Sequence, residues 1–237
     1  MSPSSMANNS GPVNPDAPRF EVFIPAEAGP LPNSGRLGVL GGAYNPITRA
    51  HLLLARYSKE QGELDEIIFV LPKSLPNKPL VGASVEQRLE MMRLGTSGTP
   101  YISLGVCSHG LFLDICTALQ QIYPMASDFY FITGRDAAER ILNWPYDDPA
   151  AALAKMFTGF QLLVFQRQGK FQLPENPLVQ KYLNRIHPLE MKENLDKVSS
   201  TEVRRRVREG RSIAKLVPPE VAFFIQKHSL YRYFAED

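Results

Sequence analysis

The sequence predicts an α/β protein with a Rossmann-like, doubly wound parallel sheet and flanking helices. Two observations lead to this prediction. Apolar runs of strand length alternate with segments of helical periodicity along most of the 237 residues, which is typical of parallel strands covered by helices. The first of these runs, residues 37–40, ends in a glycine turn that leads into a helix, as strand–turn–helix units of such sheets do.

The individual elements follow from the same patterns. Strands are expected at residues 37–40, 66–71, 101–106, 128–133, 160–165 and 186–191. Helices are expected at residues 48–61, 84–95, 111–123, 137–143, 150–156, 199–209 and 219–228. Because ligands of a doubly wound sheet lie at the carboxyl ends of its strands, the loops after the first, second and fourth strands are the ones to search.

The length and composition predict one globular domain with an N-terminal extension. Residues 36–237 are expected to form a single domain, and residues 1–35, whose first part is rich in Ser, Asn, Pro and Gly, to be disordered. The short apolar segment 20–24 could still dock on the domain. Whether the domain forms a homo-oligomer is left open, since buried and interface apolar residues look alike in a sequence.

Charge and cysteine content exclude several classes of protein. The formal net charge of +2 is too small to predict a nucleic-acid partner. No apolar run approaches the roughly 20 residues of a membrane span, and the N-terminus lacks the basic and apolar segments of a secretory signal. Cys107 and Cys116 lack the spacing of a disulfide framework or thiolate metal site, so a reducing cytoplasm is expected.

The segment 41–51, Gly-Gly-Ala-Tyr-Asn-Pro-Ile-Thr-Arg-Ala-His, carries the strongest functional signal. A strand, a glycine turn and a helix N-terminus form a site where backbone N–H groups can face a phosphate. Asn45 is a typical N-cap and Pro46 fits the first helical position. Thr48 and His51 are three residues apart, so both should point to the end of the helix that favours an anion. A capping loop with a histidine that only packs is the alternative.

Two other loops follow strands of the predicted sheet. Lys73 and Lys78 lie in a proline-rich loop after the second strand, where either could hold a polyphosphate or simply be solvated. After the fourth strand, Gly134 permits close backbone approach, and Asp136 could bind a base amine or ribose hydroxyl or cap the following helix. Trp144, the only tryptophan, could stack on a heteroaromatic ring or belong to the core.

The segment 198–208 predicts a second anion site. Ser199 and Glu202 have the spacing of a capping box, so a helix should start here. The hydroxyls of Ser200 and Thr201 would lie among the free N–H groups of its first turn, together with the guanidinium of Arg204.

Four segments together resemble a known family. The motif of residues 41–51 resembles the His-x-x-His or Thr-x-x-His signature of nucleotidyltransferases, and Ser-Ser-Thr-Glu-Val-Arg at 199–204 resembles their distal Ser-Ser-Thr-x-x-Arg motif. Residues 84–92 and 134–136 resemble the nicotinate/nicotinamide mononucleotide adenylyltransferases in particular. The resemblance covers roughly residues 36–231.

The resemblance implies a fold of the nucleotidyltransferase type and an activity in NAD biosynthesis. The substrates would be ATP and a pyridine mononucleotide, and Mg²⁺ would be carried mainly by the ATP phosphates rather than by a protein site. The attacking phosphate is already anionic, so the site has to bring two anions together and neutralise charge. The implied catalytic residues are His51, Thr48, Lys78 and Arg204. The implied substrate-binding residues are Gly41, Gly42, Ala43, Tyr44, Asn45, Gly134, Arg135, Asp136, Trp144, Ser199, Ser200 and Thr201.

Three questions stay open at this point. Residues 110–114 replace a Thr-rich stretch that helps to hold the nicotinate ring in bacterial members, so the preference for nicotinate or nicotinamide is undecided. Lys73 remains an alternative to Lys78. Two other functions also remain, a transferase with another phosphorylated acceptor and a non-catalytic nucleotide-binding regulator.

Overall fold

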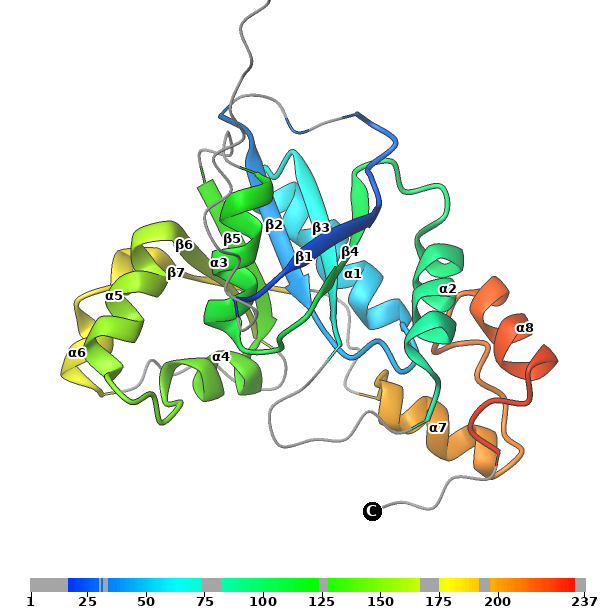
Figure 1. Ribbon diagram of the computed structural model, residues 1–237. Helices are drawn as coiled ribbons and strands as arrows, with labels where there is room; N and C mark the ends of the chain where they lie inside the picture. The colour runs from blue at the N-terminus through cyan, green and yellow to red at the C-terminus, as the bar shows by residue number, and fades with distance from the viewer. Residues whose placement is uncertain are drawn as a thin grey trace, which may run out of the picture.

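The computed structural model of the chain describes residues 17–29, 31, 34–73, 82–123, 128–166, 175–191 and 197–232. In this part of the chain a seven-stranded sheet has the order β1-β4-β3-β2-β5-β6-β7 (Figure 1). The strands are β1 (Phe20–Ile24), β2 (Arg36–Gly41), β3 (Glu66–Pro72), β4 (Ile102–Cys107), β5 (Asp128–Gly134), β6 (Phe160–Gln166) and β7 (Ile186–Glu190). β1 pairs antiparallel to β4, and the other pairs of this sheet are parallel.

The helices confirm the predicted alternation of strand and helix. They are α1 (Arg49–Gln61), α2 (Val85–Thr96), α3 (Phe112–Ile122), α4 (Arg135–Leu142), α5 (Pro149–Gly159), α6 (Pro177–Gln180), α7 (Ser200–Arg208) and α8 (Pro219–Lys227), with a 3-10 helix η1 (Leu183–Arg185). Each predicted strand and helix is present, and the largest difference is the end of α5, at Gly159 rather than residue 156. The patterns do not predict α6 and η1, because so short a helix carries no periodicity.

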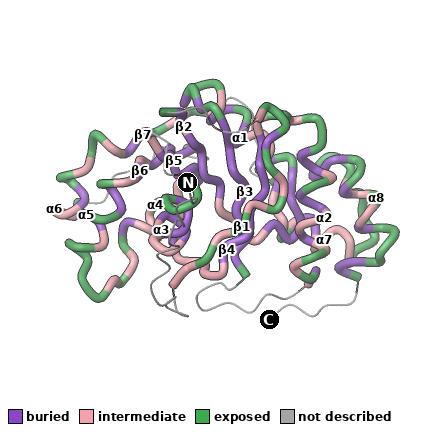
Figure 2. The backbone as a smooth tube through the Cα atoms, turned by 45° about the horizontal axis from the view of Figure 1, so that its top comes forward, coloured by how far each residue is buried: buried purple, intermediate pink, exposed green. Residues whose placement is uncertain are grey.

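Helices cover both faces of the sheet, so its inner strands β3 and β4 are buried along their whole length, whereas the edge strands β1 and β7 keep exposed residues (Figure 2). Along β3, Ile67, Phe69 and Leu71 pack in one core with α1, α2, α7 and α8. The alternate residues Ile68 and Val70 pack in the other core with α3, α4 and α5. Within the described ranges, no helix is long and apolar enough to span a membrane.

The first strand corrects the expected domain boundary. Residues 20–24 form β1, in which Phe20 pairs with Cys107 and Val22 with Gly105 of β4. The prediction that residues 1–35 are a disordered extension is therefore wrong for this segment, and its docking on the domain is confirmed. Residues 1–16 lie outside the described residues. Local composition misses β1 because an edge strand becomes stable only by pairing with a neighbour that is distant in sequence.

The order of the strands decides where a ligand site can form. The chain runs from β2 through β3 to β4 on one side, and then returns to place β5, β6 and β7 on the other side of β2. In open α/β sheets such a reversal marks the crevice where ligands bind, which here corresponds to the carboxyl ends of β2 and β5. In Figure 1 the helices α4 and α7 lie below this edge of the sheet.

Candidate active site at the carboxyl edge of the sheet

The loop between β2 and α1 lies at this crevice and is packed against the sheet by Tyr44. The Tyr44 ring is 1% exposed, stacks on Phe69 with ring centroids 5.5 Å apart, and its hydroxyl donates to Leu40 O. A Cβ at Gly42 would lie 3.2 Å from this ring, so the close approach favours glycine. Gly42 N–H donates to Val70 O at 3.1 Å. The Tyr44 side chain, predicted to contact substrate, instead lies beneath the loop.

The start of α1 corrects one part of the sequence prediction. The N-cap is Thr48, and the helix begins at Arg49, so Asn45 does not cap it and Pro46 lies before it. The Asn45 side chain is used elsewhere. Its Oδ1 accepts hydrogen bonds from Ala83 N–H at 3.3 Å and from the Tyr231 hydroxyl at 2.9 Å. Partners distant in sequence thus outcompete the local capping preference.

The Thr48 N-cap orients His51. The backbone N–H of Thr48 donates to Nδ1 of His51 at 3.0 Å, and Thr48 Oγ1 lies 2.8 Å from the same nitrogen. Because Nδ1 accepts, the neutral imidazole carries its proton on Nε2, which makes Nε2–H the donor. Thr48 is 0% exposed and its hydroxyl is used in this contact. Its side chain therefore orients the imidazole rather than facing the crevice.

The helix α7 begins as predicted, with Ser199 as its N-cap. Ser199 Oγ accepts from Glu202 N–H at 3.1 Å. The Glu202 carboxylate does not turn back to the cap, but accepts from Arg206 at 2.6 Å and from Arg205 at 2.9 Å. Hydrogen bonds from Arg206 and then Arg205 lower the pKa of Glu202. These arginines are thus part of an ion-paired helix face.

The two predicted anion sites meet in space. Arg204 Nη1 donates to the backbone oxygen of Asn45 at 2.8 Å, across 159 residues of sequence. Ser200 Oγ donates to Pro46 O at 2.7 Å, and Arg204 Nη2 donates to Thr201 Oγ1 at 3.3 Å. The first turn of α7 is therefore joined directly to the loop that leads to His51. His51 and Arg204 thus lie on segments that contact each other at one edge of the sheet.

Arg88 is a site residue that the sequence analysis did not single out. It is 1% exposed, and its guanidinium donates from Nε to Ala83 O at 2.8 Å and from Nη1 to Ala43 O at 3.3 Å. Burial lowers the pKa of Arg88, and the neighbouring Arg204 lowers it further. Helical periodicity could have found it, because Arg88 shares the buried side of α2 with Met91, Met92 and Gly95.

The other side of the crevice is formed by the end of β5 and the start of α4. Gly134 ends β5 and is the N-cap of α4, so Asp136 is not the cap but lies in the first turn. The Asp136 side chain is 84% exposed, and Arg135 Nε lies 3.3 Å from its Oδ1. A Cβ at Gly134 would meet no atom within 4 Å, which shows open space at this strand end. Trp144, after α4, is half-buried rather than part of the core.

Only one of the two candidate lysines lies among the described residues. Lys73 is exposed at the end of β3, and its N–H donates to Cys107 O at 2.8 Å. Lys78 lies outside the described residues. Among the residues that the structure describes, no group of three or more His, Cys, Asp or Glu side chains could hold a metal ion.

The chain is similar to known proteins. A family profile described as cytidylyltransferase-like matches residues 39–206. A probable nicotinate-nucleotide adenylyltransferase of Thermus thermophilus is 33% identical over 202 residues, which cover 83% of this chain and 100% of the relative. A relative of the same description from Desulfotalea psychrophila is 30% identical over 213 residues, covering 83% and 99%.

Solved structures share the fold. The nicotinic acid mononucleotide adenylyltransferase of Plasmodium falciparum, complexed with NaAD, aligns with a TM-score of 0.65 at 20% identity, covering 85% of this chain and 100% of that one. A putative nicotinate-nucleotide adenylyltransferase of Vibrio parahaemolyticus aligns with a TM-score of 0.53 at 16% identity, covering 84% and 97%. At such low identity these likenesses concern the fold alone.

Proposed function

The chain belongs to the nicotinate-nucleotide adenylyltransferase family, and we propose that it transfers the adenylyl group of ATP to nicotinate mononucleotide. The products are the dinucleotide and pyrophosphate. The observation that carries the proposal is the hydrogen bond from Arg204 to Asn45 O, because it joins two cationic helix N-termini in one site.

The reaction needs charge stabilisation more than proton transfer. An oxygen of the acceptor phosphate forms a bond to the α-phosphorus of ATP, and the bond from that phosphorus to the bridging oxygen of pyrophosphate breaks. The nucleophile is an anion, so no general base is required. The protein's task is to bring two anions together and to stabilise the charge that develops on the transferred group.

His51 is suited to the α-phosphate. Thr48 holds Nδ1 as an acceptor, so Nε2–H is the group of the ring that can donate to a phosphate oxygen. The N-terminus of α1 adds its own positive potential at the same place. In this proposal Thr48 is a positioning residue and His51 the catalytic one.

The first turn of α7 is suited to the β- and γ-phosphates. Its free backbone N–H groups, with the Arg204 guanidinium beside them, form an anion site. Lys73 or Lys78 would add a further cation. Mg²⁺, when bound, would neutralise part of the triphosphate charge and would be held largely by the phosphates.

The β5 side of the crevice is suited to the nucleoside and the pyridine. The open space at Gly134 admits close approach of a ligand, and the exposed Asp136 carboxylate can accept from an amine or a ribose hydroxyl. Trp144 is half-buried, and in this proposal its indole ring stacks on the pyridine. We also propose a cytoplasmic location, supported by the free thiols of Cys107 and Cys116.

The direct test measures pyrophosphate release from ATP and Mg²⁺ with several acceptors. Nicotinate mononucleotide, nicotinamide mononucleotide and phosphopantetheine are compared with a reaction that lacks an acceptor, and chromatography identifies the product. We expect dinucleotide formation with nicotinate mononucleotide. Turnover only with phosphopantetheine, or ATP binding without turnover on any acceptor, would contradict the proposal.

A further inference from the structure

Asn45 connects three segments that are distant in the sequence. Its backbone oxygen accepts from Arg204 of α7 at 2.8 Å. Its side-chain Oδ1 accepts from Ala83 N–H, just before α2, at 3.3 Å, and from the Tyr231 hydroxyl, beyond the end of α8, at 2.9 Å. The Tyr231 bond spans 186 residues. Asn45, in the loop that leads to His51, therefore accepts hydrogen bonds from two residues in the C-terminal part of the chain.

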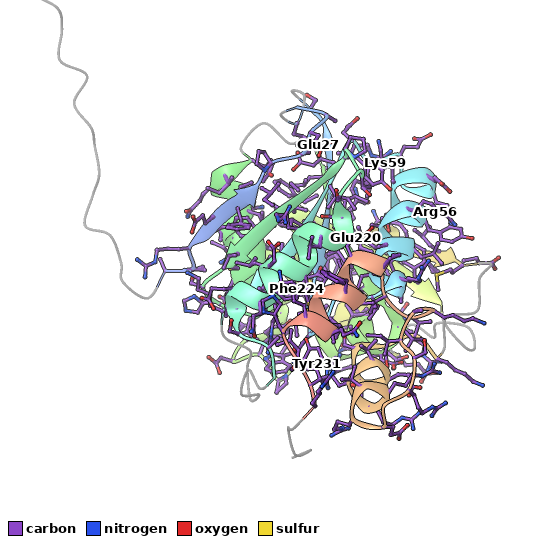
Figure 3. The ribbon with its side chains drawn as sticks, turned by 90° about the vertical axis from the view of Figure 1, so that its right-hand side faces the viewer. Glu27, Arg56, Lys59, Glu220, Phe224 and Tyr231 are labelled. Carbon is purple, nitrogen blue, oxygen red and sulfur yellow. The ribbon has the colours of Figure 1, made fainter. Side chains whose placement is uncertain are left out.

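Tyr231 is buried and has an unusual backbone conformation. It is 1% exposed, and it adopts φ of 66°, a left-handed conformation that residues with side chains rarely take. Figure 3 shows Tyr231 below α8, the helix that carries Phe224; in the sequence Tyr231 follows the end of this helix. A Cβ at Gly82 would lie 3.4 Å from the Tyr231 ring and 2.9 Å from Asn45 Nδ2, so the chain before α2 also closes on this contact.

The Tyr231 hydroxyl is a constant donor. Burial raises the pKa of Tyr231 well above that of a free tyrosine, although the nearby Arg88 and Arg204 oppose this shift. The phenol therefore stays protonated at neutral pH. Because Asn45 Oδ1 can only accept, the direction of the hydrogen bond is set.

We propose that Tyr231 is a positioning residue for the adenylyl transfer. Its hydroxyl holds Asn45, and Asn45 holds both the loop before His51 and the guanidinium of Arg204. Arg88 contacts the same loop nearer to its start, where Nη1 donates to the backbone oxygen of Ala43. This inference rests on the proposed function, since its purpose is to hold the two phosphate-binding helix ends in register. A displacement of about 1 Å in such a site can cost orders of magnitude in rate.

The test is the variant Tyr231→Phe, which removes only the hydroxyl and keeps the ring. We expect kcat to fall roughly tenfold and KM for ATP to change less than about twofold, because the contact acts on positioning more than on ground-state binding. The matched control is Tyr130→Phe. Tyr130 is also buried, and its hydroxyl accepts from Arg36 Nη2 at 2.7 Å, far from the crevice. Its kcat should match that of the wild type.

A second readout does not depend on turnover. Amide hydrogen exchange of the peptide 41–51 should be faster in Tyr231→Phe than in the wild type and unchanged in Tyr130→Phe. If the wild type formed no dinucleotide, the proposed function would fail, and the exchange experiment would still decide whether Tyr231 holds the loop. Unchanged exchange, or faster exchange with unchanged kcat in an active wild type, would overturn the positioning role.

A double substitution tests the route through Arg204. In an Arg204→Ala background, Tyr231→Phe should lower kcat by less than about threefold, because one of the two groups that it helps to orient is gone and only the loop before His51 remains. A full tenfold loss in that background would show that Tyr231 acts independently of Arg204, and would overturn the proposed route.

Discussion

The two ends of the sheet hold their cationic side chains in different ways. At the amino end, the Arg36 guanidinium forms an ion pair with Glu63 at 3.2 Å, and the backbone N–H of the same residue donates to Asp65. At the carboxyl end, Arg204 donates to a backbone carbonyl and to the Thr201 hydroxyl, and in the described part of the chain no carboxylate pairs with it. A carbonyl orients a guanidinium but leaves its charge uncompensated.

This difference shows where an anion is expected. A cationic side chain that is held in place without a carboxylate partner can bind an anionic ligand. A cationic side chain that already pairs with Glu contributes instead to the structure of the protein. The same contrast separates the arginines of α7 from one another. Arg205 and Arg206 pair with Glu202 on the helix face, and Arg204 is directed at the loop of the other motif.

The largest effect is expected from His51→Ala. Removal of the donor Nε2–H should lower turnover by roughly two to four orders of magnitude, with a much smaller loss of ATP affinity, because the contact is strongest in the transition state. The matched control is His187→Ala at the amino end, where Nε2 lies 2.6 Å from Gln161 Oε1. Steady-state kinetics and ATP titration should show near-normal values for the control. Near-normal turnover of His51→Ala would remove it from the mechanism.

A smaller effect is expected from Arg204→Ala. Loss of one uncompensated cation should reduce kcat/KM for ATP about 100-fold, in line with a charge-assisted contact to a phosphate. Arg36→Ala removes an arginine that is already paired, so its kinetic constants should stay within about twofold and only its stability should fall, by about 1 kcal/mol. Equal kinetic losses in the two variants would contradict the contrast between the two ends.

Thr48→Val should have a moderate effect. The substitution keeps the shape of the buried side chain and removes only the hydroxyl beside Nδ1, while the backbone N–H still fixes the imidazole. One neutral hydrogen bond corresponds to about 1 kcal/mol, or roughly a fivefold fall in kcat. Thr96→Val, which removes a buried hydroxyl bonded to Met92 O, serves as the control. A loss as large as that of His51→Ala would show that Thr48 itself contacts the substrate.

The smallest kinetic effect is expected from Ser199→Ala. Loss of the N-cap of α7 should cost about 1 kcal/mol of unfolding free energy in urea titrations. Asp148→Ala removes the N-cap of α5, whose side chain accepts from Ala151 N–H at 3.0 Å, and should cost a similar amount. Only the Ser199 variant should raise KM for ATP, by about twofold to threefold, because of these two helices only α7 begins at the crevice. An equal change in both would indicate a purely structural role.

Much of the molecule follows from local patterns. The strands β2 to β7 are found within one or two residues of their predicted bounds. For the inner strands the reason is that parallel strands buried on both faces have continuous apolar runs. The start of α7 at Ser199 follows from a capping preference that acts over three residues. The two motifs that we propose to bind phosphate are likewise visible as residue types at fixed spacing.

The sequence by itself determined the element order, the fold class and the position of the two helix N-termini that we propose as anion sites. Tertiary structure alone decided that β1 joins the sheet, that Arg88 lies beneath the loop and that Asn45 is a tether rather than a cap. The physical reason is one of range. Propensity and capping act over a few residues, whereas a buried polar side chain takes whichever partner the packed chain brings near it. For Asn45 those partners are Tyr231 and Arg204, which no local pattern connects to it.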